Sequence, residues 1–260
     1  MSVLELREVS VQFGSGSRIV RAVDNVSFAV ETGSVVGLVG ESGSGKSTLA
    51  KAIVGLIPLR TGGIFWDGDL IRAQSRRSIQ ALGSTAERVQ YIFQDPYASL
   101  DPRMKVGDSI AEGFIVRRDI PRVQRDSEVV RLLDMVRLDG DARHALPREL
   151  SGGQRQRVAI ARALACRPRI LIADEITSSL DVSIQGAVLN VIKDVQRETG
   201  VGVLFISHNL AVVRYLADTI AVMHSGRIVE SGRTEDVAEH PREVYTQELL
   251  AAVPSIRDSM

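Results

Sequence analysis

The apolar and polar positions at the start of the chain alternate with a period of two. The alternation covers residues 3–13, stops at a Gly-Ser-Gly-Ser break over 14–17, and resumes over 19–30 before a Glu-Thr-Gly turn at 31–33. Period-two alternation bounded by glycine-rich turns is typical of half-buried antiparallel strands. We therefore expect the chain to begin with an antiparallel β-subdomain, its strands joined by a flexible loop and a tight turn.

Short apolar runs then alternate with segments of helical spacing. The predicted strands lie at 35–39, 62–68, 169–173 and 201–206, and the predicted helices at 46–53, 184–198 and 210–217. Strands that alternate with helices imply a parallel sheet with right-handed crossovers. This part of the sequence predicts an α/β core.

Between the two parts of this core the character of the sequence changes. Over 100–165, apolar residues recur at helical spacing, most clearly at 106–116 and 123–138, with charged residues between them. We expect a helical subdomain inserted into the core there. The stretch after Gly232 is predicted to be helical and solvent-facing, with prolines as breakers.

The composition is that of an ordinary globular protein, which narrows the possible functions. Of the 260 residues 44% are hydrophobic and 25% charged, and 32 basic residues balance 32 acidic ones. No net field therefore attracts nucleic acid or an anionic membrane, and we expect no nucleic-acid partner. Cys166 is the single cysteine, which excludes an intrachain disulfide, a four-cysteine zinc site and a cysteine-ligated iron–sulfur cluster. A reducing cytosol suits this cysteine content best.

Targeting and membrane segments are not expected. The first residues have neither the basic start nor the long apolar stretch of a secretory signal. No apolar run approaches the roughly 18 residues that a spanning helix needs. We therefore expect that the chain does not cross a membrane by itself.

Residues 40–47 complete a phosphate-binding loop of the form G-x-x-x-x-G-K-[ST]. The apolar run before the loop predicts a strand, and the segment after it predicts a helix that begins near Lys46, so a chance glycine turn is the weaker interpretation. The three glycines of the loop let backbone N–H groups converge on phosphate oxygens, and the start of the helix adds its dipole. The motif predicts binding of a nucleoside triphosphate.

Two side chains of this loop have specific roles in that prediction. Lys46 supplies a point charge for the β- and γ-phosphates, and the Ser47 hydroxyl is a ligand for Mg²⁺. The residues expected to contact the nucleotide here are Gly40, Glu41, Ser42, Gly43, Ser44, Gly45, Lys46, Ser47 and Thr48.

A second glycine motif lies far from the phosphate loop. It consists of Leu150, Ser151, Gly152, Gly153 and Gln154. By itself the motif predicts the N-terminus of a helix, capped by Ser151, whose backbone amides attract an anion. A purely structural loop is the alternative. Together with the phosphate loop, this pentapeptide resembles the signature motif of the ATP-binding cassette (ABC) ATPases. The resemblance implies that the signature of one protomer caps the γ-phosphate held by the phosphate loop of the other.

Other motifs of this family follow in the right order. Residues 170–175 resemble the Walker B strand, which implies that Asp174 orients Mg²⁺ through water and that Glu175 polarises the attacking water. Gln94 resembles the glutamine that joins the Mg²⁺ shell and senses the membrane partner. The expected metal set is therefore Ser47, Gln94 and Asp174.

Two further positions are assigned by the same resemblance. Asp181 resembles part of the loop that crosses to the other protomer, and His208 resembles the switch histidine that contacts the γ-phosphate. A lone histidine after a strand is usually structural, but the other motifs in register favour the functional interpretation of His208. The residues expected to act in catalysis are Glu175, His208, Lys46 and Gln94.

Two further positions bear on the resemblance to the family: one matches it, and the other differs from it. Phe13 stands where the family has an aromatic residue near the end of its first strand, and its ring suits stacking on adenine, with packing in the strand core as the alternative. After Asp174 and Glu175 the family continues with proline, but this chain has Ile176. Because a proline restricts the residue before it, we expect Ile176 to loosen the positioning of Glu175 slightly without abolishing catalysis.

Within the family, the likeness is strongest to ATPase subunits of dipeptide, oligopeptide and nickel importers. Residues 93–104 resemble their extended glutamine loop, and 180–185 resemble the segment after their crossing loop. Their tail motif of His-Pro-Tyr-Thr, a leucine pair and proline is partly present. The matching residues are Tyr245, Thr246, Leu249, Leu250 and Pro254, whereas Glu243 and Val244 replace the His-Pro pair.

The resemblance implies a P-loop NTPase fold over the whole chain. We expect a RecA-like core with the antiparallel β-subdomain at 1–99 and 166–232, a helical subdomain at 100–165, and a C-terminal tail at 233–260. The implied ligands are ATP and Mg²⁺. The implied surface for a membrane partner lies around residues 94–103, where Pro96 and Tyr97 are unusually apolar and rigid for a loop.

The implied function is that of an ATP-hydrolysing subunit on the cytoplasmic face of the membrane. It would power an importer for peptides or a related small solute such as nickel. Its partners would be transmembrane permease subunits, a second ABC ATPase subunit, identical or homologous, and indirectly an extracytoplasmic solute-binding protein. The alternative is a soluble ABC ATPase of another assembly, such as a phosphonate-degradation complex or one for repair or translation.

Overall fold

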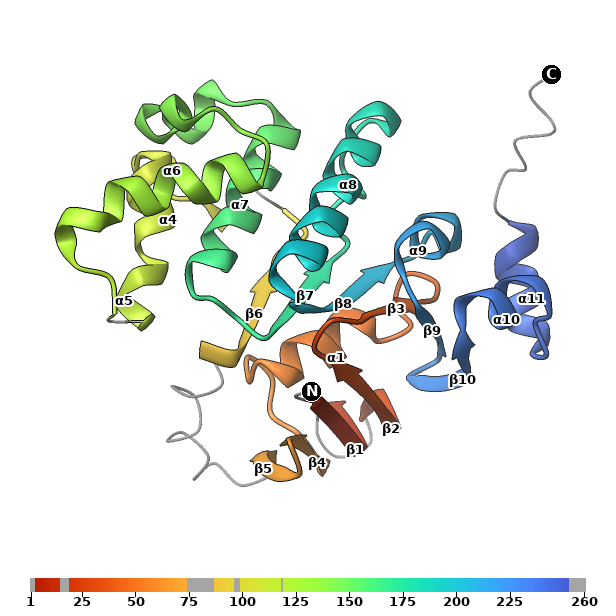
Figure 1. Cartoon of the computed structure of the whole chain (residues 1–260). Coiled ribbons are helices and arrows are strands. Elements are labelled where there is room, and N and C mark those ends of the chain that lie inside the picture. The colour runs from red at the N-terminus through yellow and green to blue at the C-terminus, as the bar shows by residue number, and fades with distance from the viewer. Residues whose placement is uncertain (1–2, 15–18, 74–86, 96–98, 118, 253–260) are drawn as a thin grey trace, which may run out of the picture. The chain divides into compact units, whose positions relative to one another are not determined.

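The computed structural model describes residues 3–14, 19–73, 87–95, 99–117 and 119–252 (Figure 1). The chain forms two compact units, one from Met1–Leu82 and Gly202–Met260 and the other from Gly83–Val201. Three predicted features lie largely or wholly outside the described residues. They are the flexible loop at 14–17, the rigid pair Pro96 and Tyr97, and Pro254.

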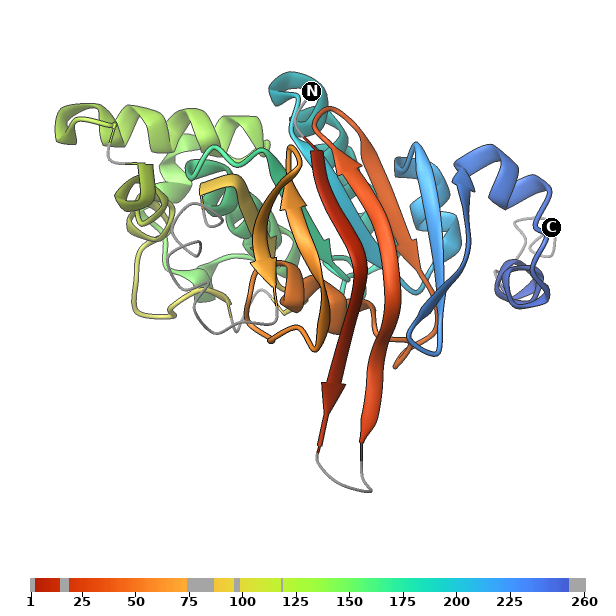
Figure 2. The same cartoon turned by 90° about the horizontal axis from the view of Figure 1, so that it is seen from below.

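The first unit begins with the antiparallel sheet that the period-two pattern predicts. Its strands are β1 (Val3–Phe13), β2 (Val20–Glu31), β4 (Thr61–Trp66) and β5 (Asp69–Ala73), in the order β2-β1-β4-β5. Figure 2 shows β1 and β2 side by side as a long hairpin, whose last pair is Phe13 and Val20.

The first unit also holds the part of the core that carries the phosphate loop. The strands β3 (Val35–Val39), β8 (Gly202–Ser207), β9 (Thr219–His224) and β10 (Arg227–Arg233) lie in the order β10-β9-β3-β8. Every residue of β3 is buried, because β8 and β9 flank it as parallel neighbours. In contrast, β10 runs antiparallel to β9, so this sheet is mixed rather than wholly parallel as predicted.

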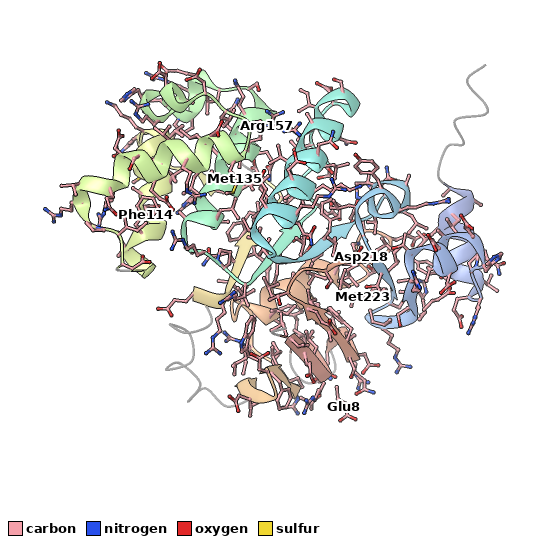
Figure 3. All side chains as sticks on the ribbon, in the orientation of Figure 1. Glu8, Phe114, Met135, Arg157, Asp218 and Met223 are labelled. Carbon is pink, nitrogen blue, oxygen red and sulfur yellow. The ribbon has the colours of Figure 1, made fainter. Side chains whose placement is uncertain are left out.

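Helices of the first unit connect and cover these strands. They are α1 (Lys46–Ile53), α9 (Leu210–Leu216), α10 (Thr234–Glu239) and α11 (Val244–Ala251). The last two confirm a helical tail, and most of its described residues are exposed, as predicted. One side of the tail nevertheless packs on the unit, because Val237 of α10 is buried and Thr246 of α11 is fully buried. Figure 3 labels Met223, a buried residue of β9.

The second unit combines two parallel strands with a helical part. The strands are β6 (Val89–Ile92) and β7 (Ile170–Asp174), which pair in parallel. The helices are α4 (Val106–Ala111), α5 (Gly113–Arg117), α6 (Arg125–Met135), α7 (Gly152–Ala165) and α8 (Val182–Thr199). Phe114, labelled in Figure 3, is fully buried on α5.

The two predicted helical stretches are therefore confirmed as helical, but their boundaries differ from the prediction. The pattern at 106–116 divides into α4 and α5, and the pattern at 123–138 shortens to α6 with a 3₁₀ turn at Arg122–Gln124 before it. Among the helices that the structure describes, none combines the length and apolar character that a membrane crossing needs.

Candidate nucleotide-binding site

The phosphate loop connects β3 to α1 in the first unit, as the sequence predicts. β3 ends at Val39, the loop follows, and α1 begins at Lys46, so the first amides of the helix point out of its N-terminus. Gly43 has a φ of 84°, and an added Cβ there would meet nothing within 4 Å. The loop at this point therefore has a conformation that favours glycine, with open space beside the Gly43 Cα.

The Lys46 ammonium lies inside the loop that it follows. Its side chain donates hydrogen bonds to the carbonyl oxygens of Gly40 at 2.7 Å and Glu41 at 2.8 Å, and to Ser44 Oγ at 3.4 Å. Lys46 is only 3% exposed. A charge held this way is already in place for the phosphates of a nucleotide, which would bring the anion that the buried cation favours.

The loop is held from outside by neighbouring segments of the same unit. The backbone N–H of Gly226, in the turn between β9 and β10, donates to the Ser44 carbonyl at 2.9 Å. The backbone N–H of Glu41 donates to the hydroxyl of Tyr245, on α11, at 2.9 Å. In the sequence Tyr245 matches only part of a tail motif, and no local pattern predicts this contact.

His208 lies beside the phosphate loop along the sheet. Because β3 and β8 are parallel and pair Val39 with Ser207, the loop after β3 and His208 after β8 leave the same edge of the sheet. Asn209 accepts hydrogen bonds from the first amides of α9, Ala211 at 3.0 Å among them, which fixes the short connection that carries His208. The structure therefore brings the predicted switch histidine next to the strand that carries the phosphate loop.

Phe13 ends β1 and is 44% exposed. This exposure contradicts the alternative that its ring packs in the strand core. An exposed aromatic face is available for stacking on a purine, which is the role predicted for Phe13.

Three predicted site residues meet in the second unit. β6 and β7 pair in parallel, so Gln94 after β6 and Glu175 after β7 leave neighbouring strand ends. Gln94 Nε2 donates to Glu175 Oε2 at 3.3 Å and to Ser178 Oγ at 3.3 Å. Asp174, the last residue of β7, is 3% exposed.

Asp174 has a partner that sequence reasoning missed. The hydroxyl of Tyr91, on β6, donates a hydrogen bond to the Asp174 carboxylate. Burial, followed by this hydrogen bond and the charges of Asp174 and Glu175, raises the pKa of Tyr91. The phenol therefore stays protonated and remains a donor. A tyrosine inside an apolar strand, three residues before Gln94, was the available signal.

The backbone at Glu175 differs from the extended form that a following proline would favour. Glu175 has a φ of 48°, in the left-handed region, and Ile176 is fully buried. The Glu175 carbonyl accepts hydrogen bonds from the Ser178 backbone at 3.1 Å and from its hydroxyl at 2.9 Å. These contacts stabilise the position of Glu175 in the absence of proline.

The second glycine motif forms a helix N-terminus, as its residues alone predict. Ser151 is the N-cap of α7, and Ser151 and Gln154 exchange hydrogen bonds of 2.8 and 3.3 Å as a capping box. A Cβ added at Gly153 would lie 2.4 Å from Cγ2 of Ile184 on α8. Close packing therefore requires glycine at 153, whereas a Cβ at Gly152 would meet Leu180 at 3.3 Å.

Asp181 lies at the N-cap position of α8 and is exposed. Gln185 donates to the carbonyls of Thr177 at 2.8 Å and Leu180 at 3.1 Å, which fixes the loop before α8. Asp181 is thus presented at the surface by a fixed loop, where a residue that contacts another protomer would lie.

The donor set suits Mg²⁺ bound together with phosphates. Ser47, Asp174 and Gln94 offer hydroxyl, carboxylate and amide oxygens, which are the hard ligands that this ion prefers. Within the described residues, no group of three or more histidine, cysteine or acidic residues could hold a metal alone. The residues present therefore fit an ion that arrives with nucleotide phosphates, since Mg²⁺ is held by few protein ligands in such sites.

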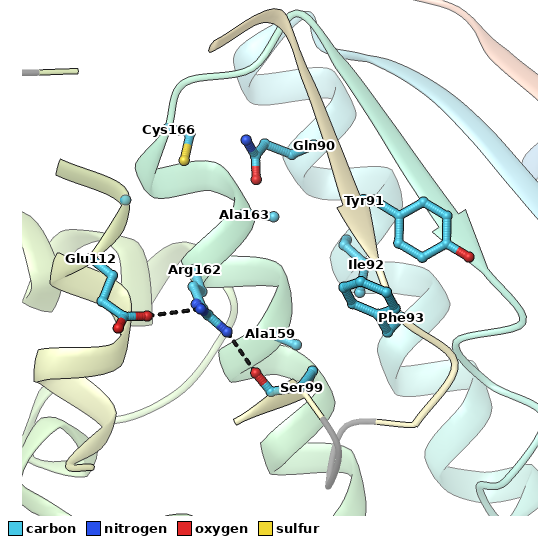
Figure 4. A pocket seen from close by; sticks show the side chains of 11 residues that line it. Gln90, Tyr91, Ile92, Phe93, Ser99, Glu112, Ala159, Arg162, Ala163 and Cys166 are labelled. Atoms are coloured by element: carbon cyan, nitrogen blue, oxygen red, sulfur yellow. Dashed lines mark hydrogen bonds and ion pairs between the residues drawn. The ribbon is translucent and has the colours of Figure 1, made fainter. Parts of the chain in front are cut away.

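A pocket of about 260 Å³ in the second unit lies on the surface predicted to meet a partner (Figure 4). Phe93, which is 43% exposed, and Cys166 are among its lining residues. Arg162 of α7 crosses it and donates to the Ser99 carbonyl at 2.6 Å and to Glu112 Oε2 at 2.7 Å. The ion pair connects α7, which Ser151 caps, with Glu112 before α5, and the hydrogen bond to Ser99 connects α7 with the segment after Gln94.

Comparisons with known proteins agree with this arrangement. The ABC transporter family profile matches residues 23–178. An oligopeptide transport ATP-binding protein of Streptococcus mutans is 48% identical over 254 residues, which cover 97% of this chain and 82% of that protein. A putative peptide import ATP-binding protein of Brucella ovis is 42% identical over 253 residues, covering 97% of this chain and 79% of that protein.

Solved structures with the same fold have been determined. An ATP-binding cassette solved as a dimer in a post-hydrolysis state with ADP and Pi aligns with a TM-score of 0.78 at 27% identity, covering 89% of this chain and 98% of that one. A subunit of a Clostridium perfringens ABC transporter complex aligns with a TM-score of 0.80 at 26% identity, covering 91% and 90%.

Proposed function

Because the chain belongs to the ABC transporter family and is one of its ATPase subunits, we propose that it hydrolyses ATP to power a peptide importer. The observation that carries the proposal is the contact between Gln94 and Glu175, directly after the buried Asp174. The peptide substrate is supported by the importer relatives and by the resemblance of residues 93–104 to their glutamine loop.

The residues have separate tasks in this reaction. Lys46 and the amides of the phosphate loop hold the β- and γ-phosphates. Glu175 orients and deprotonates the attacking water, and Gln94 holds the Glu175 carboxylate in place. Ser47, Asp174 and Gln94 would hold Mg²⁺, which neutralises phosphate charge when bound. His208 contacts the γ-phosphate, and Phe13 stacks on the base.

The site is completed by a second ATPase subunit. Ser151, Gly152, Gly153 and Gln154 of one protomer cap the γ-phosphate bound by the other, and Asp181 lies in the loop that crosses between them. The exposed N-terminus of α7 supports this role, because its amides favour an anion. A single chain would therefore bind ATP but hydrolyse it poorly.

The motor acts on membrane partners at the cytoplasmic face. Permease subunits would bind the surface that includes Phe93 and the pocket crossed by Arg162, and a solute-binding protein would deliver peptide from the other side. ATP-driven closure of the dimer would reach the permease through Gln94, since Gln94 contacts Glu175 and precedes this surface.

Nucleotide binding tests the first part of the proposal. Lys46→Ala removes the cation that faces the phosphates and should abolish ATP binding measured by titration calorimetry. Lys51→Ala, on the same helix, is the matched control and should bind ATP as the wild-type chain does. Equal ATP affinity in Lys46→Ala would exclude the phosphate loop as the site.

Co-purification tests the importer role. The chain, expressed with an affinity tag in its native cells, should be recovered from membranes together with polytopic membrane subunits. Hydrolysis by that complex should rise when peptide and its binding protein are added. Recovery with soluble partners alone would contradict the importer and favour another assembly.

A further inference from the structure

One peptide group of the phosphate loop is held from both sides. Its carbonyl, from Gly40, accepts a hydrogen bond from Lys46 Nζ at 2.7 Å, and its N–H, from Glu41, donates to the Tyr245 hydroxyl at 2.9 Å. The described chain contains no cis peptide bond, so this N–H and carbonyl point in opposite directions. Lys46 and Tyr245 therefore bind opposite sides of one rigid plane.

Tyr245 is itself fixed against the segment that supports the loop. Its ring lies against that of His224, with centroids 4.0 Å apart and planes at 50°. His224 ends β9, and the turn that follows holds the Ser44 carbonyl through the Gly226 amide at 2.9 Å. The two contacts to the phosphate loop thus come from linked segments, since Tyr245 packs on His224, which lies two residues before Gly226.

The start of α11 is anchored as well, so Tyr245 does not rest on a loose tail. The Glu230 carboxylate, on β10, accepts hydrogen bonds from the backbone N–H of Arg242 at 2.9 Å and of Glu243 at 3.2 Å. Thr246, the next residue after Tyr245, is fully buried. β10 therefore holds the first turn of α11, and α11 presents the phenol to the loop.

We propose that Tyr245 is a positioning residue for ATP, whose hydroxyl orients the Gly40–Glu41 peptide and through it the Lys46 ammonium. The inference deepens the proposed function, on which it rests. Hydrogen bonds in a chain polarise one another, so a peptide that donates to the phenol is a better acceptor for Lys46. The loop is then preorganised for phosphate before nucleotide arrives, which lowers the cost of binding.

Exchange, binding and kinetic measurements on Tyr245→Phe test this role, since the variant keeps the ring against His224 and removes only the hydroxyl. The first is amide hydrogen exchange of Glu41 by NMR without nucleotide. The second is the dissociation constant of Mg-ATP by calorimetry, followed by kcat and KM in the assembled transporter. Tyr215→Phe, on α9, is the matched control for loss of a phenol oxygen.

The expected effect follows from losing one hydrogen bond. Glu41 exchange should accelerate and Mg-ATP should bind about three- to tenfold more weakly in Tyr245→Phe, with KM raised more than kcat is lowered. Tyr215→Phe should stay within about twofold of the wild-type chain.

The outcomes separate this inference from the proposed function. If the wild-type chain binds Mg-ATP and Tyr245→Phe binds it with equal affinity, the positioning role of Tyr245 is wrong and the proposed function stands. Unchanged exchange at Glu41 in the variant would also overturn it, because the contact would then not hold the peptide in solution. If the wild-type chain binds no ATP, the proposed function fails and the role of Tyr245 fails with it.

Discussion

The hydroxyl of Tyr91 donates a hydrogen bond to the carboxylate of Asp174 across the parallel pair of β6 and β7. Asp174 is predicted to act on Mg²⁺, yet its carboxylate is almost fully buried. A buried carboxylate needs donors, and the phenol supplies one without adding a charge.

Tyr91→Phe should therefore destabilise the protein while leaving the strand pair intact. A hydrogen bond to a charged acceptor contributes about 1.5–3 kcal/mol, so the free energy of unfolding should fall by roughly that amount. Urea unfolding monitored by circular dichroism measures the change. Tyr215→Phe, at a half-exposed position, serves as the control, and equal losses in both variants would refute a specific role for the Asp174 contact.

Glu175→Gln should retain ATP binding and lose turnover. The amide cannot accept a proton from water, so kcat should fall by about 10²- to 10⁴-fold, which is roughly 3–5 kcal/mol of barrier. Steady-state phosphate release by the assembled transporter measures the loss. In Ser178→Ala, which removes a hydroxyl that donates to the Glu175 carbonyl, kcat should fall by less than in Glu175→Gln. Turnover at the wild-type rate in Glu175→Gln would remove Glu175 from this role.

Ser151→Asp should block assembly on ATP without unfolding α7. Aspartate caps a helix as serine does, but it would place a carboxylate against the partner's γ-phosphate. ATP binding by the isolated chain should be nearly normal, whereas ATP-driven dimerisation, measured by analytical ultracentrifugation, should fall at least about tenfold.

The matched variant for this experiment is Ser151→Asn, which caps equally well and carries no charge. It should lose much less dimerisation than Ser151→Asp. Gly153→Asp is a poorer test, because any Cβ at 153 would strike Ile184. Loss of ATP affinity in monomeric Ser151→Asp would place the signature beside its own phosphate loop and contradict the composite site.

The link between β10 and α11 should weaken in acid. Burial opposes ionisation of Glu230, but the Thr246 side chain and the hydrogen bonds from the backbone N–H groups of Arg242 and Glu243 outweigh it and lower the pKa of Glu230 below its usual 4.5. Such a carboxyl stabilises the fold above its ordinary pKa and ceases to do so as the pH falls through the folded value. Protection factors of α11 amides should therefore drop below about pH 4.5. Glu230→Gln should abolish this pH dependence of the α11 protection factors. If the variant keeps the same pH dependence, other titrating groups cause it.

The local part of the site was predictable from the sequence, and the long-range part was not. The phosphate loop, the strand ending at Asp174 and the helix capped by Ser151 follow from contiguous residues whose spacing fixes the backbone. Tyr245 contacts Glu41 across 204 positions, and no local pattern encodes that pairing. The pair Tyr91 and Asp174 depends on strand register, which is set only when β6 and β7 align.

The strands β5, β6, β9 and β10 were not predicted, and for β9 the signal was local. The predicted helix ended at 217, before β9 begins, and the apolar run Ile220–Met223 with the Ser-Gly turn after it was visible in the sequence but was not assigned to a strand. The predicted domain boundaries remain a prediction.

Gly43 and Gly153 are glycines of two different family motifs, and the fold requires glycine at each for a different reason. At Gly43 an added Cβ would meet nothing within 4 Å, but the φ of 84° is one that residues with a side chain rarely adopt, so the constraint is on backbone conformation. At Gly153 the first turn of α7 is ordinary and Ile184 fills the space, so the constraint is on volume. Alanine at 43 would thus strain the backbone without meeting a neighbour, whereas at 153 even this smallest side chain would strike Ile184 while the backbone stayed relaxed.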